Sequence, residues 1–150
     1  MRRSALVVFA VALMGSIGFG AQRSAAPVVD VYKTPTCGCC SKWVELLRAD
    51  GFTVRVKDLP DLSQIKSSNR IPPQLQSCHT ATVGSYVVEG HVPIAEIRKM
   101  LKERPAVAGI AVAGMPYGSP GMEVGSVKHP YNVMAFDAQG KTRVFASYGK

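Results

Sequence analysis

Apolar and polar residues follow two different periodicities along this chain. Residues 28–32 alternate apolar with polar and are rich in β-branched side chains, which predicts a strand. From residue 40 onward apolar positions recur at helical spacing until Gly51, which predicts a helix that ends there. The same criteria predict a strand at 52–56, a short helix at 61–67, a hairpin of strands at 80–83 and 86–88, and a helix at 93–104.

The helix at 93–104 has the clearest pattern. Pro93 stands at its first turn, Ile94, Ile97 and Leu101 share one face, and Pro105 follows it. The predicted order up to this point is βαβαββα. A cysteine cluster, residues 37–40, lies at the first strand-to-helix turn, and with this order it resembles the thioredoxin fold over residues 28–104.

The chain continues beyond this unit without the pattern of a second domain. Residues 106–114 are small and rich in glycine, 115–122 form a loop rich in glycine, proline and methionine, and 132–136 with 142–147 predict a hairpin. We therefore expect one α/β domain over 27–150, with a thioredoxin-like core and a C-terminal extension made of the Gly/Met-rich loop and the β-hairpin.

The N-terminus has the features of a secretory signal peptide. Arg2 and Arg3 precede an uncharged apolar run at 4–21, and small residues follow up to Ala26. The run could also be an uncleaved anchor, but the small residues favour cleavage, so we assign 1–26 as a signal peptide. The prediction is export, to the periplasm in a Gram-negative source, with no membrane span left after cleavage.

The charge of the chain is moderately basic, with a formal net charge of +8 at pH 7. Three of the arginines lie in the predicted signal region, and the rest of the chain contains no long basic run and few interleaved aromatic residues. This distribution argues against nucleic-acid binding and is typical of a solvated surface.

The four cysteines are Cys37, Cys39, Cys40 and Cys78. An exported protein of this size would ordinarily use them in two structural disulfides, but three of them are crowded into four positions. At most one can pair with Cys78, and a bond between Cys37 and Cys39 or Cys40 is a reactive redox pair more often than a staple. The spacing therefore favours thiol or metal chemistry.

The cluster contains a CxxC pair, Cys37 and Cys40, which are the candidate redox residues. At a helix N-terminus, free backbone N–H groups and the helix dipole favour the thiolate form of such cysteines. Cys39 is unnecessary for dithiol exchange but useful where thiolates bridge soft metal ions. The alternative for Cys40 is a buried small apolar residue at the start of the helix face.

Cys78 and His79 lie just before the third predicted strand, which in a thioredoxin-like fold faces the CxxC pair. Cys78 can complete a set of four sulfurs, or serve as a resolving cysteine or disulfide partner. If Cys78 faces the cluster, alternation along an extended chain predicts that His79 does not. His79 is therefore a weaker candidate ligand.

Additional metal ligands are predicted in the C-terminal part. Met115 and Met122 lie in the loop rich in glycine and proline, where thioethers would select Cu(I), although either could instead fill the core. His129 is a further candidate, while His91 and Met134 are assigned to structure. Zinc or an iron–sulfur cluster would also suit four sulfurs, but compartment, ligand softness and the methionines favour copper.

Four segments together resemble the CopG-type copper-resistance proteins, a metal-binding family long described as a domain of unknown function. They are Thr-Pro-Thr-Cys37-Gly-Cys39-Cys40-x-x-Trp43, Ser77-Cys78-His79-Thr80, Val88-Glu-Gly-His91-Val92-Pro93 and Gly114-Met115-Pro-x-Gly-Ser-Pro-Gly-Met122-Glu123. The resemblance implies a periplasmic thioredoxin-like protein that accompanies copper efflux systems. It also implies a cysteine-bridged cluster of several Cu(I) ions on Cys37, Cys39, Cys40 and Cys78, and copper oxidation-state interconversion as an activity to be tested.

Three functions follow as hypotheses. The first is copper binding in copper resistance or homeostasis, with an efflux component or a periplasmic copper carrier as the partner and copper oxidoreductase activity as an open question. The second is a thiol–disulfide oxidoreductase that uses Cys37 and Cys40. The third is an interaction module with a structural zinc ion, which predicts unfolding on chelation.

Overall fold

The computed structural model describes residues 26–149. The predicted signal peptide, 1–26, lies outside the described residues except for Ala26. Among the described residues, no helix combines the length and apolar character needed to cross a membrane.

The elements follow the predicted order and then continue. The strands are β1 (Val28–Lys33), β2 (Thr53–Asp58), β3 (His79–Val83), β4 (Tyr86–Glu89), β5 (Gly109–Ala111), β6 (Tyr131–Phe136) and β7 (Thr142–Tyr148). The helices are α1 (Gly38–Ala49), α2 (Ser63–Ser68) and α3 (Ile94–Glu103), with a short 3₁₀ helix, η1 (Pro73–Leu75). The βαβαββα order predicted from the sequence is confirmed.

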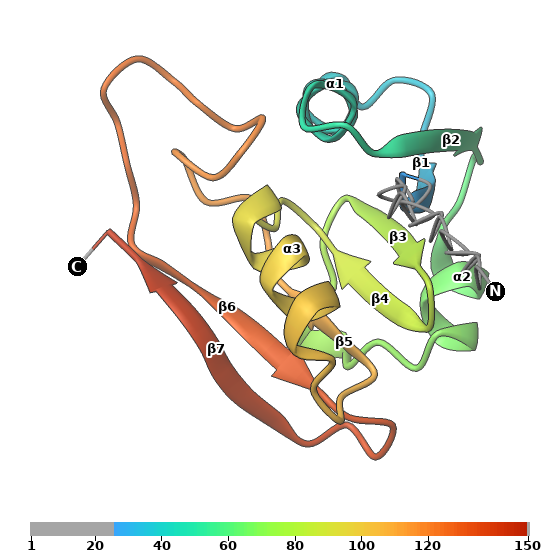
Figure 1. The fold of residues 1–150 in the computed structure, drawn as a ribbon. Helices are drawn as coiled ribbons and strands as arrows, with labels where there is room; N and C mark the ends of the chain where they lie inside the picture. The colour runs from blue at the N-terminus through green and yellow to red at the C-terminus, as the bar shows by residue number, and fades with distance from the viewer. Residues whose placement is uncertain (1–25, 150) are drawn as a thin grey trace, which may run out of the picture.

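All strands of the described chain join one mixed sheet in the order β2-β1-β3-β4-β5-β6-β7 (Figure 1). β1 pairs in parallel with β2, β4 pairs in parallel with β5, and the other neighbours are antiparallel. The C-terminal extension is therefore not a separate unit, because β5, β6 and β7 extend the same sheet.

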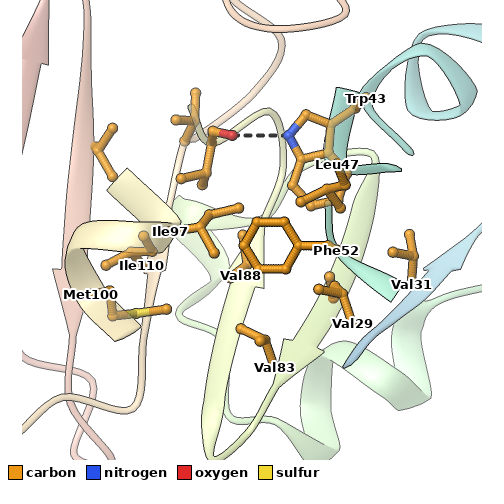
Figure 2. Close-up of a cluster of buried hydrophobic side chains, with 14 of the residues drawn as sticks. Val29, Val31, Trp43, Leu47, Phe52, Val83, Val88, Ile97, Met100 and Ile110 are labelled. Carbon is orange, nitrogen blue, oxygen red and sulfur yellow. Dashed lines mark hydrogen bonds between the residues drawn. The ribbon is translucent and has the colours of Figure 1, made fainter. Parts of the chain in front are cut away.

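Helices cover both faces of the sheet. The main core packs α1 and α3 onto one face, where Trp43, Leu47, Ile97 and Met100 are fully buried against strand residues (Figure 2). On the other face, the segment after α2 contributes Ile71 and Leu75 to a second cluster that also holds Val87, Ala111 and Phe136. The inner strands β3, β4 and β5 thus form a buried middle layer, whereas the residues of the edge strands β2 and β7 are partly or fully exposed. The candidate site lies at the ends of the strands.

Several details differ from the sequence prediction. α1 begins at Gly38, two residues earlier than expected, and α2 begins at Ser63 because the carboxylate of Asp61 accepts hydrogen bonds from the Ser63 backbone N–H and hydroxyl. The predicted apolar face of α3 is rotated slightly, since Met100 is fully buried and Leu101 only partly.

Strand β5 was not predicted, because its residues are small and give no strand periodicity. Its glycine explains this composition: a Cβ at Gly109 would lie 2.2 Å from the carbonyl oxygen of Val87. A larger side chain would prevent β5 from lying beside β4.

Candidate metal centre

Three of the four cysteines lie at the N-terminal end of α1. Cys37 is the N-cap residue, and its backbone N–H donates to the carbonyl oxygen of Thr34. Cys39 and Cys40 follow in the first turn, with Cys40 fully buried at the start of the apolar face. We call these three residues the helix half of the site.

The helix half contains a disulfide bond between Cys37 and Cys40, whose Cα atoms are 5.4 Å apart. Cys39 carries a free thiol, and its sulfur lies 3.4 Å from the Cys37 sulfur. The two candidate redox residues are therefore joined, and a third sulfur lies beside them.

The remaining donors come from the sheet, and we call them the strand half: Cys78, His79 and His91. Cys78 directly precedes β3, His79 begins it, and His91 lies two residues beyond the end of β4. The Cys78 sulfur is 3.3 Å from His79 Nδ1 and 3.0 Å from His91 Nε2.

The structure differs from the sequence expectation at both histidines. His79 was expected not to face the cluster, but it belongs to a donor group with Cys78, which lies outside the regular strand, so strict alternation does not apply there. His91 was assigned to structure, yet its ring contacts the Cys78 sulfur. The signal that could have identified it is its position just beyond a strand that pairs with β3, because the ends of neighbouring strands meet at one sheet edge.

The protonation state of His91 follows from its contacts. Nδ1 lies 2.8 Å from the carbonyl oxygen of Pro120, which can only accept, so Nδ1 carries the hydrogen and Nε2 presents a lone pair to Cys78. Burial lowers the pKa of His91, although the Pro120 carbonyl and the charge of Glu123 oppose this effect. The ring is therefore neutral and able to act as a ligand.

His79 is fully buried, and its Nε2 has no hydrogen-bond partner among the described residues. Burial lowers its pKa well below the usual value, with smaller contributions from His91 and Lys66. Its ring packs against Trp43, with centroids 4.4 Å apart, and against His91 at 4.9 Å. A neutral imidazole held in place with one unsatisfied nitrogen is suited to a soft or borderline metal.

The two halves converge on one place. Two groups of four donors each have all their ligand atoms within 4.8 Å of one another: Cys37, Cys39, Cys40 and Cys78, and then Cys40, Cys78, His79 and His91. The groups share Cys40 and Cys78, so four sulfurs and two imidazoles form one continuous cluster.

Cys78 occupies the middle of this cluster, and its thiol is held in the protonated form. Burial, followed by the neighbouring Cys39, raises the pKa of Cys78 to about 11. A cation bound at this position would offset both effects, because it favours the thiolate.

The loop after β5 lies against the helix half. Gly121 has φ +83°, and a Cβ there would be 2.9 Å from the Cys39 carbonyl oxygen and 3.1 Å from the Trp43 backbone nitrogen. Together with the contact from Pro120 to His91, this packing closes the cluster on one side.

The two candidate methionines flank this closing loop. Met122 follows Gly121 directly, and Met115 follows Gly114, whose carbonyl oxygen accepts a hydrogen bond from the Ser77 hydroxyl. Met115 is 52% exposed and Met122 is partly buried. Their backbone thus lies beside the cluster, and coordination by either thioether stays a prediction.

Two other sequence assignments concern residues away from the cluster. His129 packs against Tyr117 with the rings tilted by 39° and their centroids 5.0 Å apart, and it belongs to neither donor group in the described part of the chain. Met134 lies in β6 and packs against the second core cluster, in agreement with its structural assignment.

Trp43 connects the cluster to the core. Its indole N–H donates to the Val92 carbonyl oxygen at 2.9 Å, a bond drawn in Figure 2, while its ring contacts His79. Through this residue, α1 holds both the segment that carries His91 and the start of β3. The helix and strand halves are thus fixed relative to one another.

A mixed α/β domain that brings four partly or fully buried sulfurs together with two buried imidazoles is typical of a metal-binding protein. A family model described as a protein of unknown function, DUF411, matches residues 75–122. No curated protein matches the chain.

Two solved structures are similar over most of the chain, and both are named copper resistance protein CopG. Form 2 is 42% identical with a TM-score of 0.79, covering 83% of this chain and 99% of its own. Form 1 is 42% identical with a TM-score of 0.78, covering 82% and 98%. The chain therefore belongs to the CopG family of copper resistance proteins, as its motifs indicated.

Proposed function

We propose that this protein binds copper in the periplasm as part of copper resistance, holding Cu(I) in a cluster bridged by Cys37, Cys39, Cys40 and Cys78. The observation that carries the proposal is the convergence of all four sulfurs within 4.8 Å of one another. Thiolate sulfur is the ligand type that selects Cu(I), and four sulfurs this close can be shared between several ions. Copper is the cargo or substrate of the protein.

The donor set also supports a redox activity. When the Cys37 and Cys40 thiolates each give up one electron and join as a disulfide, two Cu(II) ions are reduced to two Cu(I) ions. The disulfide form leaves Cys39, Cys78, His79 and His91, and imidazole nitrogen suits copper as well as zinc. Return to the dithiol requires two electrons from an external thiol reductant.

The wider assignments belong to the same proposal. The βαβαββα order with a CxxC pair at the first turn supports a thioredoxin-like core. The charged start, apolar run and small residues of 1–26 support export behind a cleaved signal peptide. Met115, Met122 and His129 stay candidate ligands, and a copper efflux component or a periplasmic copper carrier is the expected partner.

One alternative has an observation in its favour. The disulfide between Cys37 and Cys40 at a helix N-terminus also suits a thiol–disulfide oxidoreductase, with Cys37 as the nucleophile and Cys40 as the resolving thiol. A structural zinc ion would use the same thiols, but it would make folding depend on the metal.

Replacement of the two free cysteines separates these functions. The copper content and oxidation state of the anaerobically purified protein should show more than one Cu(I) per chain, and both Cys39→Ser and Cys78→Ser should lose this stoichiometry. A dithiol oxidoreductase would instead retain full disulfide-exchange activity in both variants and bind no copper. For a zinc module, chelation should unfold the protein, which circular dichroism would detect.

A further inference from the structure

A buried charged network lies beneath the strand half of the site, on α2, β3 and β4. Glu89 is fully buried, and Lys66 is 8% exposed. Lys66 Nζ donates to Glu89 Oε1 at 2.5 Å and to the Thr80 hydroxyl at 3.2 Å, while that hydroxyl donates to Glu89 Oε2 at 2.7 Å. None of these three side chains forms a hydrogen bond with the side chain of a candidate metal ligand.

The network nevertheless reaches the metal centre through the backbone. Glu89 Oε1 accepts a hydrogen bond from the Ser77 backbone N–H at 2.6 Å, immediately before Cys78. The Ser77 hydroxyl in turn donates to the Gly114 carbonyl oxygen, just before Met115. A single carboxylate therefore fixes the segment that presents Cys78.

The end of β4, which carries Glu89, also forms backbone hydrogen bonds with the start of β3 and with the residue just after β5. The N–H of Gly90 donates to the His79 carbonyl oxygen at 3.0 Å, and the N–H of Val112 donates to the Glu89 carbonyl oxygen at 3.0 Å. A Cβ at Gly90 would lie 2.6 Å from Ser77 Cβ, which shows how closely this backbone approaches the segment. Cys78 is thus held by the end of β4 as well as by β3, which it directly precedes.

A purely stabilising role does not account for this arrangement. A buried ion pair pays a desolvation cost that its attraction often only matches, so apolar residues of similar size can replace it with little change in stability. What an apolar pair cannot supply is the acceptor for the Ser77 N–H. Directional, fully satisfied buried hydrogen bonds fix the position of the groups they join.

We propose that Glu89, supported by Lys66, is a positioning residue that holds the Ser77–Cys78 backbone so that the Cys78 sulfur faces the helix half. The effect of this positioning on copper binding rests on the proposed function above, but the positioning itself is a property of the metal-free protein. It is therefore testable without copper.

Two double variants isolate the acceptor. Lys66→Met/Glu89→Leu removes the charges and the acceptor, whereas Lys66→Met/Glu89→Gln removes the charges and keeps an oxygen for the Ser77 N–H. A third pair, Asp30→Leu/Arg55→Met, removes an ion pair between β1 and β2 that is unconnected to Cys78 and serves as the control.

The first measurement is the rate at which a thiol reagent alkylates Cys78 when Cys37, Cys39 and Cys40 are all serine. We expect the leucine variant to react about tenfold faster or more, because a released segment exposes the thiol, while the glutamine variant and the control keep the parent rate. In the chain with all four cysteines, the leucine variant should bind Cu(I) about tenfold more weakly in competition with a Cu(I) chelator.

Equal Cys78 reactivity in the leucine and glutamine variants would overturn the proposal. If the leucine variant does not fold, hydrogen exchange of the Ser77 amide in the unmodified protein decides: strong protection supports the proposal, and exchange at the rate of an exposed amide overturns it. If the unmodified protein binds no copper, the proposed function fails while the alkylation and exchange results stand.

Discussion

The two halves of the metal centre are built in different ways. The helix half comes from residues 37–40, is adjacent in sequence and contains a disulfide bond. The strand half gathers Cys78, His79 and His91 from two strand ends and depends on backbone hydrogen bonds and a buried carboxylate. One half can change its oxidation state, and the other is a fixed set of donors. On the proposed function, we expect the redox state of the helix half to set the copper affinity, while the strand half stays the same.

The largest expected effect comes from the oxidation state of the helix half. Reducing the disulfide should raise Cu(I) affinity by at least about 3 kcal/mol, or two decades in Kd, because two further thiolates become available. Competition with a Cu(I) chelator, with the Cys37→Ser/Cys40→Ser variant as a control, measures this change. Equal affinity in the reduced and disulfide forms would remove the distinction between the halves.

Removal of His91 tests the strand half. His91→Ala should weaken copper binding by about tenfold to a hundredfold in the disulfide form, where imidazoles form half of the remaining donor set. His129→Ala is the comparison variant and should lose less, because its ring lies against Tyr117 and belongs to neither donor group in the described part of the chain. Competition with a Cu(I) chelator under anaerobic conditions compares the two variants, and equal losses would show that His91 contributes no more to copper binding than His129.

The close packing of the strand half predicts a stability difference between two glycines with positive φ. Gly90→Ala should destabilise the protein by about 2 to 4 kcal/mol, because a Cβ would lie 2.5 Å from the Val112 carbonyl oxygen. Gly84→Ala meets open space and should cost only about 1 kcal/mol of backbone strain. Urea denaturation gives both values. Similar losses of stability at the two positions would mean that the backbone at Gly90 does not pack closely against Ser77 and Val112.

The smallest effect concerns pH. Because burial raises the pKa of Cys78 to about 11, its alkylation in the metal-free disulfide form should rise with pH well above the range of an ordinary thiol. The folded state holds this proton more tightly than the unfolded state, so this contribution to stability is present below the unfolded pKa and is lost as pH rises toward 11. If the alkylation rate of Cys78 reached half of its maximum near pH 9, the surrounding residues would not enclose the thiol.

The helix half was predictable from sequence because its chemistry is local. The periodicities of the flanking strand and helix are enough to locate a CxxC pair between them. They therefore predicted that Cys37, Cys39 and Cys40 lie at the start of α1. The apolar positions that recur at helical spacing from residue 40 include Trp43 and Leu47, and the structure buries both.

The strand half could be predicted only in part. Cys78 was expected opposite the cluster, and the predicted hairpin of β3 with β4 could have placed His91 at the same sheet edge. The contact with Pro120 that orients the His91 ring comes from a distant loop, which no local pattern encodes. The Lys66–Glu89 pair was missed for the same reason, since a Lys on a short helix and a Glu at a strand end look like surface residues. Strand β5 was missed because close backbone packing selects small residues, which erase the period-two signal.

The central claim is that both halves hold copper together, and X-ray absorption at the copper edge tests it most directly. Cu(I)-loaded protein should show sulfur ligands with copper–copper scattering, and Cys78→Ser should abolish the copper–copper contribution. A copper site whose spectrum is unchanged by Cys78→Ser would contradict the account, because the helix half would then bind copper alone.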